Sequence, residues 1–475
     1  MTSRASRAST PSPGWSDATG RRCTDKWPAP GTVRYVLPSQ LANERIRLRS
    51  DLVALLGTRR LIWFGTRAED AASLDREGML HGVVSLIGRV DSARATSLSL
   101  EELTGRRVDL DLFDVDVDLS SSERAWILDA LRAPRASGAI AAYRPSRVVE
   151  SLRSSHADPL VLVMSQEAQR AFEDKARIEA ALCARGIPVV GWGPADASAT
   201  AARRLFDEGP VLVRDAAGTS GGVGVRRVRD TADLESVLAA PRGMSISPYI
   251  DGAVPVNVAG VVWGRGLTLH PATVQLIGIA DCTAREFGYC GNDAAALARL
   301  DRRQVEALER LVVAVGDWLH ESGYRGAFGV DALIRGPEAI FLEINPRLQG
   351  STRLSGLLSH AIGAPDIVLE HLGAIAGLAP PPLQHLTDLA SVVPEWAHVV
   401  VHARSPKDRG SHARALVAHA ATNGLRDVDS VLPDNVIPDA GAILARLTTE
   451  TLLTETGYSL VAPWERVLRR WASHG

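Results

Sequence analysis

Two polar runs in the second half of the chain contain residue types that bind metal ions. The first, YRGAFGVD, ends at Asp331, and the second, FLEINPRLQG, contains Glu343 and Asn345. Both runs have the composition of neighbouring strands, along which side chains alternate between two faces. We expect a three-residue turn over 336–338, which pairs Asp331 with Glu343 on one face; a two-residue turn opposes Leu342 instead. Two carboxylates and an amide oxygen on one face suit a hard cation such as Mg²⁺.

The same alternation predicts which neighbouring side chains reach the core. Ile340, Leu342 and Ile344 alternate with the polar residues of the second run and are expected to pack together on its apolar side. Arg347 follows directly, and its planar guanidinium fits a phosphate or a carboxylate. An isolated hairpin of this kind more often lies on the surface with its carboxylates merely solvated. The upstream segments therefore decide whether this hairpin is a metal site or an ordinary surface hairpin.

The overall composition describes a globular protein with several domains. The 475 residues are 45% apolar and 23% charged, too many for a single ordinary core. A net charge of −2 and a pI near 6.7 predict neither a nucleic-acid partner nor an anionic membrane. No apolar run reaches the roughly 18 residues of a membrane span. Four cysteines without metal-site spacing favour reduced thiols and a cytoplasmic location.

Changes in pattern along the chain predict its division into units. Residues 1–31 are rich in Ser, Arg, Thr and Pro and have no apolar h-region, which favours a disordered leader over a signal peptide. Residues 32–165 alternate apolar runs and helical stretches, as in a small parallel α/β domain. A Pro-rich joint near Leu378 opens a C-terminal α/β extension over 378–475. The strands expected in the first domain are 60–65, 81–88, 108–116 and 160–164.

A rare lysine begins a helix in the middle of the chain. The sequence holds three lysines and fifty arginines. Because arginine is the usual cation of this chain, a position that keeps lysine is a candidate for a specific role. Lys175 lies at the start of a helical segment over 173–186, which ends at Gly186 with Pro188 just after it.

A glycine-rich loop follows this helix. The strand around Arg214 enters a loop in which small residues leave backbone NH groups free to close over phosphate oxygens, and a second strand leaves it. Flexible turns look the same, so the loop alone is weak evidence. The loop residues are Gly218, Thr219, Ser220, Gly221 and Gly222.

These segments, in this order, resemble the ATP-grasp superfamily of carboxylate-amine ligases from about Glu173 onward. The resemblance implies a Rossmann-like domain before an ATP-grasp domain at 166–377, with a lid at about 200–248. It further implies ATP and Mg²⁺ as cofactors, with the metal held by Asp331, Glu343 and Asn345. The nucleotide contacts that it implies are Lys175, Arg214, Gly218, Thr219, Ser220, Gly221, Gly222, Tyr249 and Ile250.

In such enzymes a carboxylate becomes an acyl phosphate and is then captured by an amine, which implies catalytic roles for Arg347 and Lys175. The run NPRLQGST and the long flanking segments are similar to amino-acid and peptide ligases of actinobacterial secondary metabolism, including the pheganomycin-type peptide ligases. Substrates would be small-molecule or peptide carboxylates and amines, and a homodimer is expected. Ser247 and Val254 stand where the family often has glutamates. A bicarbonate-using carboxylase and a degenerate, non-catalytic ATP-binding protein are the alternatives.

The substrate side is marked only by scattered polar residues. Arg353, Arg285 and Gln275 are candidates for substrate contacts; Arg353 is equally typical of an ordinary surface, whereas Arg285 and Gln275 are more often ordinary surface residues. The acidic run from Asp109 to Asp118 is interpreted as solvated carboxylates along a strand rather than a metal site.

Overall fold

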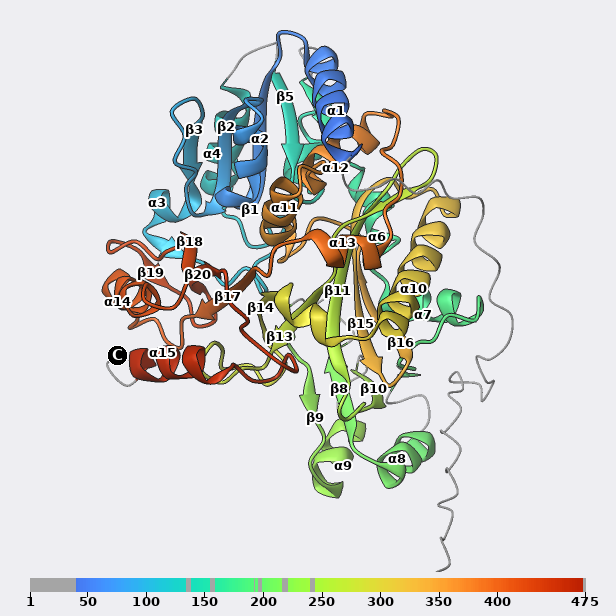
Figure 1. The fold of residues 1–475 in the computed structure, drawn as a ribbon. Coiled ribbons are helices and arrows are strands. Elements are labelled where there is room, and N and C mark those ends of the chain that lie inside the picture. The colour runs from blue at the N-terminus through green and yellow to red at the C-terminus, as the bar shows by residue number, and fades with distance from the viewer. Residues whose placement is uncertain are drawn as a thin grey trace, which may run out of the picture.

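The computed structural model describes residues 40–133, 138–153, 159–191, 193–194, 199–215, 221–239 and 244–472 (Figure 1). The expected leader over 1–31 lies outside these ranges. The architecture is a mixed α/β fold, with a parallel sheet in the N-terminal part and a large antiparallel sheet behind it. The described helices include none with the length and apolar content needed to cross a lipid bilayer.

The N-terminal part is built on a five-stranded parallel sheet, as its alternating pattern predicts. The strand order is β3-β2-β1-β5-β6. From the central strand β1 the chain adds β2 and β3 toward one edge of the sheet, and it later adds β5 and β6 on the other side of β1. Its strands are β1 (Arg60–Arg67), β2 (Leu80–Ile87), β3 (Thr96–Ser99), β5 (Gly138–Ala142) and β6 (Leu160–Leu162). Its helices are α1 (Leu41–Leu56), η2 (Ala68–Ala71), α2 (Ala72–Arg76), α3 (Leu100–Thr104), α4 (Ser121–Arg132), α5 (Arg147–Glu150) and α6 (Gln166–Arg170).

The strand expected over 108–116 is wrong, because this segment forms consecutive turns. The oxygens of its aspartates accept hydrogen bonds from nearby backbone NH groups: Asp109 from Asp111 at 3.1 Å, and Asp114 from Asp116 at 2.8 Å. Short acidic side chains that bond to the local backbone favour turns over a strand ladder.

The central antiparallel sheet joins the middle of the chain to its C-terminal part. Its strand order is β16-β15-β11-β13-β14-β17-β20-β18, with β12 paired to β11. Its middle-segment strands are β11 (Val254–Val262), β12 (Leu267–Leu269), β13 (Thr273–Ile277), β14 (Tyr289–Asp293), β15 (Gly326–Arg335) and β16 (Glu338–Asn345). The helices of this segment are α7 (Lys175–Cys183), η3 (Ala295–Arg299), α10 (Arg302–Glu321), α11 (Thr352–Ala361), α12 (Ile367–Ile375) and α13 (Leu386–Val392).

Helix α10 shows how the sequence produces one of these elements. The Asp301 side chain accepts from the Gln304 backbone NH at 2.9 Å, and the Gln304 side chain accepts in return at 2.8 Å, which forms a capping box. Val305, Leu308 and Val312 then recur at helical spacing and are buried against the sheet.

A small sheet projects from this body within the segment where a lid is expected, and it is called the lid below. Its order is β7-β10-β8-β9, and two helices flank it at the lower end of Figure 1. A separate hydrophobic cluster, which includes Val211, Val213 and Ile246, holds it together. The lid elements are β7 (Gly193–Pro194), α8 (Ala199–Glu208), β8 (Val211–Asp215), β9 (Arg226–Arg227), α9 (Thr231–Ala239) and β10 (Met244–Pro248).

The C-terminal segment extends the central sheet. It adds β17 (Ala397–His402), β18 (Leu425–Asp429) and β20 (Ile443–Thr449), with helices α14 (Gly410–Ala420) and α15 (Ala462–Ala472). It also pairs β19 (Ile437–Pro438) with β4 (Arg106–Arg107) of the N-terminal part. The fully buried Arg107 reinforces this junction by donating to the carbonyls of Ser430 at 2.6 Å and Ile443 at 2.9 Å.

The cysteines correct one expectation from composition. Cys183 is disulfide-bonded, so it is not the reduced thiol that the low cysteine content favoured. Cys282 and Cys290 are free and buried. A residue count carries no information about which thiols approach each other in the fold.

A buried carboxyl group on α12 generates a prediction for the pH dependence of stability. Glu370 accepts a hydrogen bond from Thr268, and burial raises the pKa of Glu370 to about 8. Because the folded state then holds the proton more tightly than the unfolded state, this group's contribution to stability is full below the unfolded pKa and is lost as pH rises toward 8. The amide of Glu370→Gln mimics the protonated form.

We therefore expect Glu370→Gln to gain about 2–4 kcal/mol relative to wild type between pH 5 and 8.5, since each pKa unit corresponds to about 1.4 kcal/mol. Urea unfolding across this range measures the difference. Glu306→Gln, at a partly exposed position on α10, is the control. Parallel pH profiles for wild type and Glu370→Gln would contradict the prediction.

Candidate functional site

The hairpin of β15 and β16 pairs Asp331 with Glu343, as expected, but through a different turn. Arg335 pairs with Glu338, so the turn has two residues rather than three. A β-bulge at Leu342 then shifts the register by one and restores the pairing of Asp331 with Glu343. The expected three-residue turn is thus wrong. The pairing of Asp331 with Glu343 arises instead from the extra residue, Leu342, within β16.

The bulge also changes which apolar side chains face the core. Ile340 and Leu342 pack in a cluster with Ile250, whereas Phe341 and Ile344 join the main core under α10. The expectation that Ile340, Leu342 and Ile344 share one face is therefore wrong. A bulge breaks the two-residue period of a strand, so both Leu342 and Glu343 reach the same cavity.

Asp331 lies at the centre of a hydrogen-bonded polar group. Its Oδ1 accepts from Asn257 Nδ2 at 2.6 Å and from Gln275 Nε2 at 3.0 Å, and its Oδ2 accepts from Asn345 Nδ2 at 3.2 Å. Burial, followed by the nearby charge of Glu343, raises the pKa of Asp331 to about 7. Two partly buried carboxylates held side by side are stabilised by a positive charge between them or beside them.

Lys175 supplies part of that charge. Its Nζ lies 2.6 Å from Glu343 Oε2, so the first residue of α7 reaches across to the hairpin. Arg214, on lid strand β8, is largely buried and donates to Ser245 Oγ at 3.3 Å. Burial lowers the pKa of Arg214, although the charges of Glu343 and Glu179 act in the opposite direction.

A cavity of about 290 Å³ connects these groups. The lid, the hairpin, the N-terminal part and the C-terminal segment all contribute to its walls. Gly218, Thr219 and Ser220 lie outside the described residues. The sequence-predicted residues that line the cavity are Lys175, Arg214, Gly221, Gly222, Tyr249, Ile250, Gln275, Asp331, Glu343, Asn345 and Arg347.

The described end of the glycine loop packs tightly over this cavity. Gly221 and Gly222 have φ values of 60° and 72°. A Cβ on Gly222 would stand 2.0 Å from the carbonyl oxygen of Phe287, and one on Gly221 would stand 1.9 Å from Asp111 Oδ2. Both positions therefore require glycine for conformation and for close approach.

Two expected substrate residues lie elsewhere. Arg285 forms ion pairs with Asp109 and, at 2.8 Å, with Asp111, and it does not line the cavity. These aspartates were expected to be solvated, but Asp109 is buried. Arg353 lies 2.6 Å from Asp427 and also outside the cavity lining. Both arginines join segments distant in the sequence, so no local pattern could identify their partners.

Three functional candidates were missed in the sequence. Gln349 exchanges hydrogen bonds with Asn257 at 3.1 and 2.9 Å, and Ser351 donates to Asn257 Oδ1 at 3.0 Å. Asn257 in turn holds Asp331. The signal available for Asn257 is its position as a polar residue within the otherwise apolar run VPVNVAGVV.

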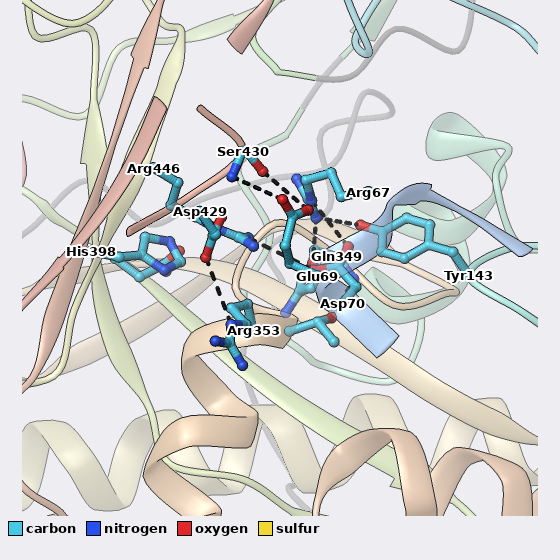
Figure 2. A network of polar contacts seen from close by, with 12 residues as sticks. Arg67, Glu69, Asp70, Tyr143, Gln349, Arg353, His398, Asp429, Ser430 and Arg446 are labelled. Atoms are coloured by element: carbon cyan, nitrogen blue, oxygen red, sulfur yellow. Dashed lines mark hydrogen bonds and ion pairs between the residues drawn. The ribbon is translucent and has the colours of Figure 1, made fainter. Parts of the chain in front are cut away.

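A buried ionic network adjoins the cavity (Figure 2). Arg67 pairs with Asp70 at 3.0 Å and donates to the Gln349 carbonyl at 3.4 Å. Arg446 lies 2.6 Å from Asp429 and 3.7 Å from Asp70. Charged side chains from the N-terminal part and the C-terminal segment thus meet beside the residues that follow the hairpin.

Glu69 adds a further acidic group to this network. Its carboxylate accepts from the Ser430 backbone NH at 2.9 Å, and burial together with the charge of Asp429 raises the pKa of Glu69 to about 7. The network therefore contains both acidic side chains and arginines. Each buried charge is stabilised by the opposite charges next to it.

Comparison with known proteins identifies the fold that carries this site. Residues 172–351 match the ATP-grasp domain family. No curated protein matches the chain. The solved structure of N5-carboxyaminoimidazole synthase from Aspergillus clavatus, with ADP and 5-aminoimidazole ribonucleotide, is 14% identical, with a TM-score of 0.56 over 87% of this chain and 100% of that chain.

A second similar structure is the biotin carboxylase domain dimer of the Hydrogenobacter thermophilus 2-oxoglutarate carboxylase, with MgADP, ADP and bicarbonate. It is 18% identical, with a TM-score of 0.55 over 87% of this chain and 89% of that chain. N5-carboxyaminoimidazole synthetase from Staphylococcus aureus, with ADP, is 15% identical, with a TM-score of 0.52 over 83% and 93%. These likenesses show the fold, an ATP-grasp fold preceded by a parallel α/β domain.

The ionic network leads to a stability prediction. Replacing Arg446 with methionine leaves Asp70 and Asp429 buried without their shared cation, so Arg446→Met is expected to lose about 3–5 kcal/mol of unfolding free energy. Urea unfolding at neutral pH measures this loss of unfolding free energy. The control is Arg414→Met, which removes an exposed ion pair with Asp434 and should cost at most about 1 kcal/mol. Equal losses in the two variants would show that the buried network is not structurally important.

Proposed function

We propose that this protein is an ATP-dependent ligase that activates a carboxylate as an acyl phosphate and joins it to an amine. The observation that carries the proposal is the convergence of Asp331, Glu343, Asn345, Lys175 and Arg347 on one cavity. Acidic oxygens for a cation and basic groups for phosphates stand within one enclosure, under a lid with glycines at its edge. The ATP-grasp fold supports this interpretation.

The donor set fits Mg²⁺. Within the described ranges no group of three or more His, Cys, Asp or Glu side chains is placed to hold a metal, so the candidate set is two carboxylates and one amide oxygen. Such a set leaves positions open for phosphate oxygens and water, as Mg²⁺ prefers. The raised pKa of Asp331 reflects repulsion by Glu343 as well as burial, and a divalent cation removes that repulsion. When bound, the ion would neutralise the charge of the nucleotide phosphates.

The remaining walls fit the rest of a nucleotide. Lys175 and Arg214 both line the cavity and present positive charge to it, one from α7 and one from β8. Val190, Leu333 and Leu342 provide an apolar end next to the backbone of Tyr249 and Ile250. We propose that adenine lies at this end and that its edge bonds to that backbone. Ser247 lines the cavity where related proteins often have a carboxylate.

The reaction then needs placement and charge stabilisation rather than a nucleophilic side chain. A carboxylate oxygen of the acid attacks the γ-phosphorus, the bond from that phosphorus to the bridging oxygen breaks, and ADP leaves. The amine nitrogen next attacks the acyl carbon, loses a proton to water, and inorganic phosphate departs. Arg347, beside the hairpin, stabilises the anionic oxygen that forms at the acyl carbon and the leaving phosphate.

For the acid we propose an amino acid or short peptide, in line with the resemblance of NPRLQGST to peptide ligases. The competing candidate is bicarbonate, which a similar solved structure holds. A mass-spectrometric screen with MgATP, pooled amino acids, short peptides and bicarbonate separates the two. A dehydrative adduct formed with ADP and phosphate supports amide formation, and bicarbonate-dependent turnover supports carboxylation. Nucleotide binding without turnover across the whole panel would favour a non-catalytic protein.

The metal assignment predicts the effect of one isosteric change. Glu343→Gln keeps the size of the side chain but removes a charge needed for the cation, so ADP formation should fall at least about 100-fold, while the unfolding midpoint changes little. Glu338→Gln, at the exposed end of the same strand, is the matched control and should retain full activity. Near-normal ADP formation by Glu343→Gln would contradict the metal assignment.

A further inference from the structure

The parallel sheet of the N-terminal part presents its topological switch point to the cavity. Strands β1 and β5 are neighbours, and the chain departs from them toward opposite edges. In open α/β sheets, the crevice at the carboxyl ends of two such strands is where ligands bind. Arg67 ends β1, while Tyr143 and Arg144 directly follow β5, and all three line the cavity. The crevice therefore opens into the proposed active site.

The charges at this crevice are positive and incompletely compensated. Within the described part of the chain, the nearest carboxylate to Arg144 is Asp114, at the ion-pair limit of 4.0 Å, and its side chain is 54% exposed. Such a pair is worth little in water. Burial and the charge of Arg347 lower the pKa of Arg144, whereas Asp114 and Glu173 act in the opposite direction. Arg144 and Arg347 thus place two like charges in the lining of the same cavity.

Arg67 is held in a defined orientation nearby. Its Nε donates to Asp70 at 3.0 Å, and one Nη donates to Tyr143 Oη and to the Gln349 carbonyl, both at 3.4 Å. The guanidinium carbon also lies 5.6 Å from the centroid of the Tyr143 ring. The ionic network in Figure 2 thereby fixes Arg67 and Tyr143 in the wall of the crevice.

We propose that the amine substrate carries an anionic group, a carboxylate or a phosphate, which Arg144 binds at this switch point beside Arg67. The inference rests on the proposed function and specifies its second substrate. The activated acid must lie at the hairpin, next to the γ-phosphate. The N-terminal part adjoins the residues that follow the hairpin, since Arg67 donates to the Gln349 carbonyl at 3.4 Å, and we infer that the amine approaches along this part of the cavity lining. An anion between Arg144 and Arg347 offsets the repulsion between them and orients the amine toward the acyl carbon.

The test compares pairs of small amines that differ in charge. Phosphoethanolamine is paired with ethanolamine, and β-alanine with β-alaninamide. Binding is measured by isothermal titration calorimetry at low salt, with and without saturating MgADP. At least one anionic member should bind wild type about tenfold or more tightly than its neutral partner, with a Kd near the millimolar range. The pair that discriminates identifies the anion as phosphate or carboxylate.

The matched variants are Arg144→Gln and Arg147→Gln. Arg147 is an exposed arginine three residues along the chain that does not line the cavity. Arg144→Gln should lose the charge discrimination and bind the anionic probe about tenfold more weakly, while MgADP affinity stays within about twofold. Arg147→Gln should behave as wild type.

Three results would overturn the inference. These are equal binding of the charged and neutral probes, an anion affinity that Arg144→Gln leaves unchanged, and no binding of either anionic probe at about 10 mM. The MgADP titrations separate this failure from that of the proposed function. A protein that binds MgADP without charge discrimination overturns only the anion subsite, whereas one that fails to bind MgADP overturns the ligase proposal itself.

Discussion

The repulsion between two carboxylates held together inside the protein is the constraint on which the site depends. Asp331 and Glu343 face each other across a strand pair, and both are partly buried. Like charges in that position are unfavourable unless cations and hydrogen-bond donors surround them. The fold supplies both: Lys175 bonds to one carboxylate, and Asn257, Gln275 and Asn345 donate to the other. This arrangement supports the proposal that a divalent cation binds there.

The surroundings of that pair come from every part of the chain. The hairpin provides the carboxylates, the lid provides Arg214, and the N-terminal sheet provides Arg67 and Arg144. The C-terminal segment continues the same antiparallel sheet and joins the N-terminal part through Arg107 and Arg446. Long-range ion pairs of this kind fix the relative positions of walls that are distant in sequence.

Local patterns in the sequence predicted the elements that carry the candidate site and failed where tertiary contacts decide. The parallel α/β pattern, the hairpin strands and the helix at Lys175 were all recognisable, since periodicity and turn residues mark them. The bulge at Leu342 leaves no such mark, and the pairing of Asp331 with Glu343 was reached by an incorrect turn. Arg285 and Arg353 could not be assigned because their acidic partners lie far away in the sequence.

The separate core of the lid has a mechanical consequence. Val211, Val213 and Ile246 pack with one another in a cluster of their own. Among the described residues, this small sheet meets the rest of the chain where Gly221 and Gly222 closely approach Asp111 and Phe287, and where the Arg227 backbone NH donates to Glu286 Oε2 at 3.5 Å. A movement of this unit as one body would break these contacts and leave its own core packed.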